Sequence, residues 1–386
     1  MKELTSNERS RFLLIVALFW FAQYVYIPNQ TPFLISIGVS SQIIGVIMGA
    51  YGISQMILRL PIGIMADMMP KHKLFIMLGS LFAGMASLIR LLNGNGLGFL
   101  IANIISGIAS AMWISYMVFY IQRHPKNQQT KATGQIVMFM NIGILTAFLT
   151  STLLIKRLGM MNLCLLSFIS GLLGFCLSFG LKEAKVTKTH LRLNQVTSVF
   201  KLKSLWVFSC VALIQQGIQL TTTMSFTNQI IFDLSQSDSV VGLSSIIYMI
   251  SAVAFSGLST QSYFIEKGPK YWIPIVLACL ALYCSLVPLC TKVSLILFLQ
   301  ILPGMATGIL FSYSTSEAMK EVPEIAHSTA MGFYQAFYAI GMSIFPIFTG
   351  KLITYYSLVV GYGALATISL IGAILVRFYY HKTKKY

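Results

Sequence analysis

The sequence predicts an all-α membrane protein with twelve transmembrane helices arranged as two six-helix bundles. Three observations predict this fold class: the composition, the apolar runs and an internal repeat. Only 10% of the 386 residues are charged, 56% are hydrophobic, and the mean hydropathy is +0.78. Soluble domains carry about 25% charged residues, so this composition excludes a soluble fold.

Apolar runs long enough to cross a bilayer, which takes about 20 residues, occur along the whole chain. They lack the period-2 alternation of barrel strands, and backbone groups in lipid must be paired within a segment, so helices are expected. The loops between them leave no room for a soluble catalytic domain. The twelve runs fall at 12–35, 43–66, 74–92, 97–121, 132–155, 161–180, 205–232, 240–264, 271–289, 293–316, 328–352 and 358–379.

Lysine and arginine residues are concentrated in alternate loops. With the N-terminus placed inside, 21 of the 27 lie on the cytoplasmic side and 5 in outer loops, where Arg90 is counted. Because these residues accumulate in cytoplasmic loops, we expect a multi-pass protein of the cell membrane with both termini in the cytoplasm. The net charge of +17 is scattered between apolar runs rather than gathered on one face, so nucleic acid is not an expected partner.

The two halves of the chain resemble each other, as in many transporter folds with internal repeats. A shift of 197 residues places an amide, a glycine, a hydroxyl and a Ser-Tyr pair of the fourth run on like residues of the tenth. A polar, basic stretch near the middle of the chain separates the halves. The expected domains are an N-terminal bundle at 1–181, a cytoplasmic linker at 182–203 and a C-terminal bundle at 204–386.

A motif stands between the second and third runs, in the segment RLPIGIMADMMPKHKLF. Gly63 allows close helix packing, and Asp67 at the helix end can bind the N-terminus of a neighbouring helix. Lys71 and Lys73 follow in a tight turn. Such a contact favours one packing of the bundles and is a candidate conformational latch. Arg59, about two turns before Asp67, is expected to take part in it, with a role as anion ligand as the alternative.

This Gly-x3-Asp segment followed by basic residues resembles the signature loop of the major facilitator superfamily, which also lies between helices 2 and 3. Helix count, repeat and inside termini extend the resemblance over the whole chain, toward bacterial drug and metabolite efflux members. It implies two six-helix bundles that rock around a central cavity. The chain departs from the family pattern at Met68 and Pro70, and from that of drug exporters at Asn103, where they usually have Arg.

The resemblance implies that helices 1, 4, 7 and 10 line the cavity, so polar and aromatic residues that share a face there are candidates for substrate binding. The alternative is that they only hydrogen-bond between helices. No carboxylate lies at mid-depth in these helices, which favours a neutral or amphipathic solute. Glu317 is expected to be a gate or loop charge, with proton carrier as the alternative. With two residues of helix 11, the candidates are Gln23, Tyr26, Gln30, Asn103, Trp113, Tyr116, Gln215, Gln219, Thr222, Gln300, Phe311, Tyr313, Gln335 and Tyr338.

These observations predict a secondary active transporter of a small solute that works by alternating access. Efflux, as by an antiporter, is the expected direction. An uptake symporter for a sugar or nucleoside is an alternative, as is a lipid flippase or a non-transporting sensor. The sequence lacks an intramembrane histidine, a metal-binding cluster and paired carboxylates, so neither an enzyme nor a metal or other cofactor is expected. The expected partners are a small-molecule substrate, the lipid bilayer and a coupling ion, proton or sodium, with the protein a monomer.

Overall fold

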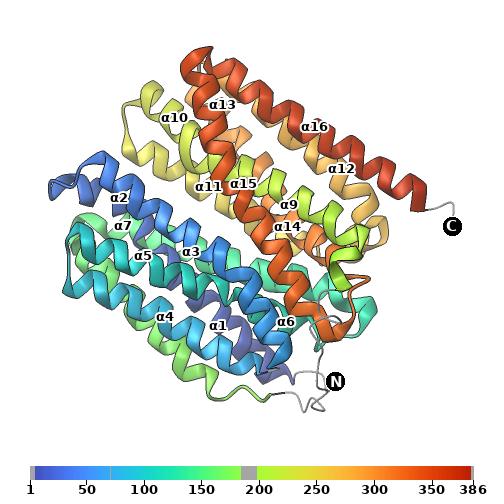
Figure 1. Cartoon of the computed structure of the whole chain (residues 1–386). Helices are drawn as coiled ribbons and strands as arrows, with labels where there is room; N and C mark the ends of the chain where they lie inside the picture. Colours follow the sequence, from blue (N-terminus) through green and yellow to red (C-terminus); the bar gives the residue numbers. More distant parts are fainter. Residues whose placement is uncertain (1–4, 70, 184–197, 384–386) are drawn as a thin grey trace. The chain divides into compact units, whose positions relative to one another are not determined.

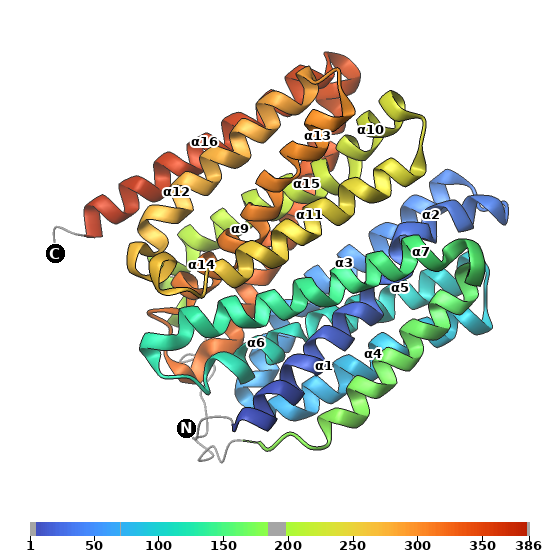
Figure 2. The same ribbon diagram turned by 180° about the vertical axis from the view of Figure 1, so that it is seen from behind.

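The computed structural model describes residues 5–69, 71–183 and 198–383, and these residues form helices and no strand. Eleven helical segments of this part of the chain are long and apolar enough to cross a membrane. One of them, Lys126–Ser178, holds two helices, because Gly159 (φ 73°, ψ 171°) interrupts α7 (Gln129–Ser178) with a conformation that only glycine adopts readily. The chain folds back there (Figure 2). The described residues therefore contain the twelve predicted transmembrane helices.

The first six transmembrane helices each overlap a predicted apolar run. Side chains cap three of them: Thr5 forms a reciprocal capping box with Glu8, and Ser40 and Asn95 accept from the first turns of their helices. In chain order they are α1 (Ser6–Tyr24) with α2 (Ile27–Ser36), α3 (Ser41–Met68), α4 (His72–Leu92), α5 (Gly96–Ala111) with α6 (Trp113–Ile121), and the two parts of α7 after η1 (Lys126–Gln128).

The last six transmembrane helices follow η2 (Ser198–Lys201) and are labelled in Figure 1. The ninth begins at Ser262, before its predicted run at 271. Gly268 (φ 71°) divides it into a short first segment and the long helix that matches the run. In chain order they are α9 (Lys203–Thr221) with the π-helical η3 (Thr222–Phe226) and α10 (Thr227–Ser235), α11 (Asp238–Leu258), α12 (Ser262–Leu286) with η4 (Val287–Leu289), α13 (Val293–Leu299) with α14 (Ile301–Met319), α15 (His327–Tyr355) after η5 (Glu324–Ala326), and α16 (Leu358–Thr383).

Within the part of the chain that the structure describes, four transmembrane helices are interrupted mid-length: the first, fourth, seventh and tenth. The breaks lie at Val25–Tyr26, at Met112, in the π-helical η3 and at Gln300. The first and the third of these are 197 positions apart, the offset of the repeat. Irregular turns inside helices change the backbone hydrogen bonding and often mark functional sites. They occur here in the four helices that, by the family resemblance, are expected to line a cavity.

The chain divides into two compact units that exchange short segments. The start of α7 belongs to the second unit, where Gly134 packs against Ser259, and the start of α15 belongs to the first. The predicted domain limits stay a prediction, and residues 184–197 of the expected linker lie outside the described residues. The first unit comprises Met1–Lys126, Phe139–Val199 and Pro323–Ala336, and the second comprises Asn127–Met138, Phe200–Val322 and Phe337–Tyr386.

Matching contacts in the two units follow the predicted repeat. Tyr51 Oη donates to Ser110 Oγ at 3.1 Å in the first unit. At the positions 197 residues later, Tyr248 Oη lies 2.8 Å from Thr307 Oγ1 in the second unit. The same pair of helices in each unit is therefore joined by the same type of hydrogen bond, as expected of a duplicated bundle.

Candidate substrate site and conformational latch

Asp67 lies at the end of α3 and binds the first turn of α15, a contact within the first unit. Its Oδ1 accepts a hydrogen bond from the backbone N–H of Ser328 at 2.9 Å, and its Oδ2 accepts one from Thr329 at 2.6 Å. The first N–H groups of a helix have no partner inside it and form the positive end of its dipole. The Asp67 side chain, which is 6% exposed, accepts hydrogen bonds from two of these N–H groups. This is the contact expected from the motif.

The backbones of α3 and α15 approach each other closely beside this carboxylate. A Cβ atom on Gly63 would meet the backbone oxygen of Ser328 and lie 3.3 Å from the Cα of Gly332. Arg59 Nη1 donates to the backbone oxygen of Gln335 at 2.8 Å. Gly63, Asp67 and Arg59 therefore make one continuous contact with the start of α15, called the α3–α15 contact below.

Lys71 and Lys73, also predicted in the latch, lie outside the α3–α15 contact. The side chain of Lys71 is exposed. The backbone N–H of Lys73 donates to Glu183 Oε2 at 2.9 Å, and its Nζ donates to the backbone oxygen of Phe179 at 2.7 Å. Lys73 thus fastens the start of α4 to the residues that follow the sixth transmembrane helix.

Beyond the ends of the transmembrane helices, a partly buried Glu183 lies near a buried Arg123. Burial raises the pKa of Glu183, while the Lys73 N–H and the nearby cations oppose this shift. Burial also lowers the pKa of Arg123, against the attraction of Glu183 and Glu8. The guanidinium donates from Nη2 to the backbone oxygen of Lys182 at 2.9 Å, so this end of the first unit is held by charged groups on four helices and their loops.

The pKa of Glu183 leads to a pH-dependent prediction. A carboxyl whose pKa is raised by folding gives stability that is complete below its unfolded pKa and is lost as the pH rises through the folded value. We therefore expect Glu183→Gln to raise the melting temperature at pH 8 and to leave it unchanged at about pH 4, near the unfolded pKa. Melting curves of the purified protein across this range test it. A variant that melts lower at pH 8 would show that the Lys73 hydrogen bond outweighs the burial cost.

Three predicted cavity residues of the first unit are joined through Ser106 and Arg90. Gln23 Nε2 donates to its backbone oxygen at 3.1 Å, and Tyr26 Oη lies 3.3 Å from its Oγ. Arg90 joins Asn103 to this group, since its Nη2 donates to Asn103 Oδ1 at 2.7 Å and to Ser106 Oγ at 2.9 Å. The first and fourth transmembrane helices are therefore connected by a buried polar cluster.

Arg90 is a buried residue of α4, and its expected position in an outer loop is wrong. The helix continues to Leu92, and the Arg90 side chain is 0% exposed. Charge counting assigns cations near helix ends to loops, although the side chain can turn back into the protein. The position of Arg90 inside the apolar run 74–92 is the sequence signal that indicates burial.

Trp113 and Tyr116 belong to an aromatic cluster between the first and fourth transmembrane helices. The Trp113 ring is stacked on Phe19 with centroids 6.3 Å apart and meets Trp20 edge-on at 5.2 Å. Tyr116 Oη donates to the backbone oxygen of Ile76 at 2.8 Å. The Tyr116 hydroxyl is thus used in helix packing, whereas Trp113 offers apolar surface.

In the second unit, predicted residues of the seventh and tenth helices form two polar contacts. Gln215 Nε2 donates to Gln219 Oε1 at 3.0 Å and lies 3.4 Å from Thr307 Oγ1. Gln300 Nε2 donates to Ser244 Oγ at 2.9 Å. The structure therefore brings Gln215 and Gln219 together and places Gln300 in a separate contact.

The remaining predicted cavity residues have contacts typical of helix packing. They either bond to a neighbouring helix or turn back to their own backbone. These contacts are Gln30 with Met48 Sδ at 3.3 Å, Thr222 with the backbone oxygen of Ile218 at 2.7 Å, Tyr313 with that of Ser259 at 3.2 Å, and the rings of Phe311 and Tyr338 at 5.9 Å.

Several buried amides of the predicted set have side-chain atoms with no hydrogen-bond partner among the described protein atoms. They are the Oε1 atoms of Gln23, Gln215 and Gln300, and both polar atoms of Gln335. All four side chains are at most 2% exposed. An unpaired buried polar group costs about 1–3 kcal/mol, so these atoms are suited to receive a polar ligand.

Glu317, the predicted gate, is 7% exposed and has two partners in the second unit. Its Oε2 accepts from Tyr380 Oη at 2.8 Å, and its Oε1 lies 3.3 Å from Lys320 Nζ. The carboxylate therefore connects the end of α14 with α16. Among the described residues, no group of three His, Cys, Asp or Glu side chains is placed to hold a metal ion.

The family comparison agrees with this architecture. The model of the Major Facilitator Superfamily matches residues 12–324 and 236–386. The chain belongs to the Major Facilitator Superfamily. This major facilitator chain is also 23% identical, over 355 residues, to an uncharacterised MFS-type transporter of Methanocaldococcus jannaschii, covering 88% of this chain and 89% of that one. The resemblance carried by the Asp67 loop is confirmed, and secondary transport across a membrane follows from the family.

Solved structures of two major facilitator transporters share the fold. The human organic anion transporter MFSD10 superposes with a TM-score of 0.77 at 12% identity, covering 96% of this chain and all of that one. The fucose:proton symporter FucP of E. coli superposes with a TM-score of 0.76 at 13% identity, covering 95% and 98%. These likenesses show the two-bundle, twelve-helix fold.

Proposed function

We propose that this protein exports a small neutral or amphipathic solute from the cell by alternating access. The observation that carries the proposal is the set of buried amides with unpaired atoms, three of which lie on interrupted helices. Ligand sites place a few polar groups within mostly apolar surroundings. In the first unit, Gln23 supplies a polar group and the ring of Trp113 supplies apolar contact surface. In the second unit, Gln215 and Gln300 supply the polar groups.

The interrupted helices support the same assignment. In many transporters, substrates bind where membrane helices are discontinuous, because backbone and side-chain groups released from regular helix packing can turn to the solute. Tyr26 and Gln300 stand directly at such breaks, and Thr222 opens the π-helical segment. We assign a role in solute binding to Tyr26 in the first unit and to Thr222 and Gln300 in the second. A contribution to helix packing alone is the competing interpretation.

The α3–α15 contact is the proposed latch. The Asp67 carboxylate and the close packing at Gly63 both depend on the same approach of α3 to α15. When the two helices separate, both interactions are lost together, so the contact favours one of two conformations. We propose that the contact forms in one state of the transport cycle and opens in the other. Lys73, through Glu183, holds the start of α4, the helix that follows Asp67 in the chain.

The direction of transport is tested by flux in proteoliposomes. Drugs, sugars and lipids are offered singly, with proton and sodium gradients imposed in separate experiments. Solute movement opposite to the coupling ion supports an exporter that acts as an antiporter, whereas movement with the ion contradicts export and assigns uptake. Specific binding without flux under any gradient would contradict transport and indicate a sensor.

Gln335→Ala tests the role of the unpaired amides. Its backbone oxygen, which binds Arg59, is retained in the variant, so only the side-chain amide is lost. We expect the apparent affinity for the transported solute to fall about tenfold, the equivalent of one buried hydrogen bond of about 1.4 kcal/mol. The exposed Gln128→Ala is the matched control. Equal affinity of both variants and the parent would remove Gln335 from the site.

A further inference from the structure

Arg90 is a buried cation whose partners are all neutral. Its Nη1 donates to Ser87 Oγ at 3.2 Å, and its Nη2 donates to Asn103 and Ser106. The Tyr26 ring covers the guanidinium, with 3.8 Å between the guanidinium carbon and the ring centroid. Its Nε has no hydrogen-bond partner among the described atoms. The guanidinium therefore keeps donor capacity that the protein does not use.

The described carboxylates of the first unit lie far from Arg90. Glu8, Asp67, Glu183 and Glu324 are all found at the end of the unit where α4 begins, as their contacts with Lys182, the start of α15, Lys73 and Gln122 show. Arg90 is 18 residues from the start of α4, which is about 27 Å along a helix. No described acid of this unit can therefore neutralise it.

A buried arginine keeps its charge, because the guanidinium does not lose its proton in proteins. Placing an unneutralised charge inside a membrane protein costs several kcal/mol. The repeat shows that the fold does not need this cation: the position 197 residues later is Val287, although Gln300 there binds α11 as Asn103 binds α3. The Arg90 charge is thus particular to the first unit, and an anionic partner would offset the cost of burying it.

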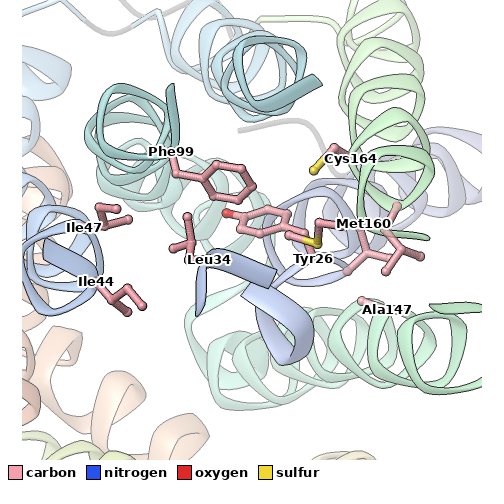
Figure 3. Close-up of a cluster of buried hydrophobic side chains, with 10 residues drawn as sticks. Tyr26, Leu34, Ile44, Ile47, Phe99, Ala147, Met160 and Cys164 are labelled. Carbon is pink, nitrogen blue, oxygen red and sulfur yellow. The ribbon is translucent and has the colours of Figure 1, made fainter. Parts of the chain in front are cut away.

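Tyr26 covers Arg90 at the break between α1 and α2. Figure 3 shows its ring among the buried side chains of Phe99, Leu34 and Cys164. Val25 and Tyr26 form a turn between α1 and α2 rather than a continuous helix. A rotation at this turn would uncover the guanidinium without unfolding α4.

We propose that Arg90 binds an oxyanion, such as a carboxylate, of the transported solute once Tyr26 has moved. A guanidinium offers two parallel N–H donors to a carboxylate, which is its preferred anion geometry. This inference rests on the proposed transport function and narrows the amphipathic solute to one with an anionic group. Gln23, bound to the same Ser106, lies next to this position and can accept from the solute through its unpaired Oε1.

Matched pairs of acids and amides test the proposal. Benzoate, 2-naphthoate and octanoate are each compared with the corresponding amide, by the melting temperature of the purified full chain and by flux into zwitterionic-lipid vesicles. We expect at least one carboxylate to bind tenfold or more tightly than its amide. Arg90→Gln should abolish this preference, and Arg90→Lys should retain part of it. Arg157→Gln, which removes an exposed cation of the same unit, should keep it.

Each outcome has a defined meaning. Equal binding of acids and amides by the parent protein, or a preference that survives in Arg90→Gln, overturns the proposal. If Arg90→Gln does not elute as a monodisperse protein, the parent and Arg90→Lys decide. A preference that is weaker in Arg90→Lys than in the parent supports the proposal, and an undiminished preference overturns it. Stabilisation through Arg90 by phosphatidylglycerol alone would assign the site to a lipid headgroup and overturn the solute role. Flux of amides without acid preference leaves transport intact, whereas absence of all flux contradicts the proposed function.

Discussion

Asp67→Asn is expected to lower the transport rate at least tenfold while changing solute affinity less than twofold. The carboxylate accepts two backbone hydrogen bonds at the start of α15, and bonds to a charged group contribute about 1.5–3 kcal/mol each. The amide retains one acceptor and no charge. Loss of about 2 kcal/mol from one conformation changes the ratio of two states roughly thirtyfold, so the cycle stalls in the other state.

Counterflow and equilibrium binding, measured on the same preparation, separate these effects. Asp233→Asn is the matched control, because this exposed carboxylate bonds only within its own helix, to Gln229 at 2.8 Å. The control should transport at the parental rate. A defect of Asp67→Asn confined to solute binding, with an unchanged rate at saturation, would contradict a latch.

Gly63→Val is expected to reduce transport by more than tenfold and to lower the melting temperature. The new side chain would meet the backbone oxygen of Ser328, which cannot move aside as a flexible side chain does. Overpacking of this kind costs about 1–3 kcal/mol. The α3–α15 contact would then form poorly, and the conformation that it stabilises would be depleted.

Gly52→Val controls for the loss of a glycine in the same helix. A Cβ atom at Gly52 would find no atom within 4 Å, so this variant changes helix propensity without the backbone clash expected at Gly63. We expect it to retain transport and stability. Similar losses in both variants would show that the α3 backbone, rather than its approach to α15, is the sensitive feature.

The fold was predictable because each membrane helix needs a long apolar run. These runs are required however the helices pack against one another, so they can be recognised from the sequence alone. The break at Gly159 follows two charged residues, Lys156 and Arg157, and was expected between two runs. The breaks at Val25–Tyr26 and Met112 were not predicted, because the apolar runs continue through them. They depend on the contacts between helices rather than on local composition.

The candidate site was predictable in part. Asp67 carried its own signal, an acid at a helix end within a recognisable motif, and it binds a helix N-terminus as expected. Lys73 was expected in the latch, but its backbone N–H binds Glu183 instead. The partner of a backbone donor depends on tertiary packing, which the sequence motif does not show. Arg90 was missed because the rotation of α4, which turns the guanidinium toward Asn103, is set by packing and not by charge counting.

The exchange of short segments between the two units constrains the order in which the protein can mature. The first unit includes Pro323–Ala336, which the ribosome adds about 124 residues after Val199. At 5–20 residues per second, the 261 residues from Asp67 to Ser328 take roughly 13 to 52 s to synthesise, and only then do the peptide N–H groups that bind Asp67 exist. A nascent first half is therefore an incomplete body whose acidic helix end is exposed to chaperones and proteases until the eleventh helix is inserted.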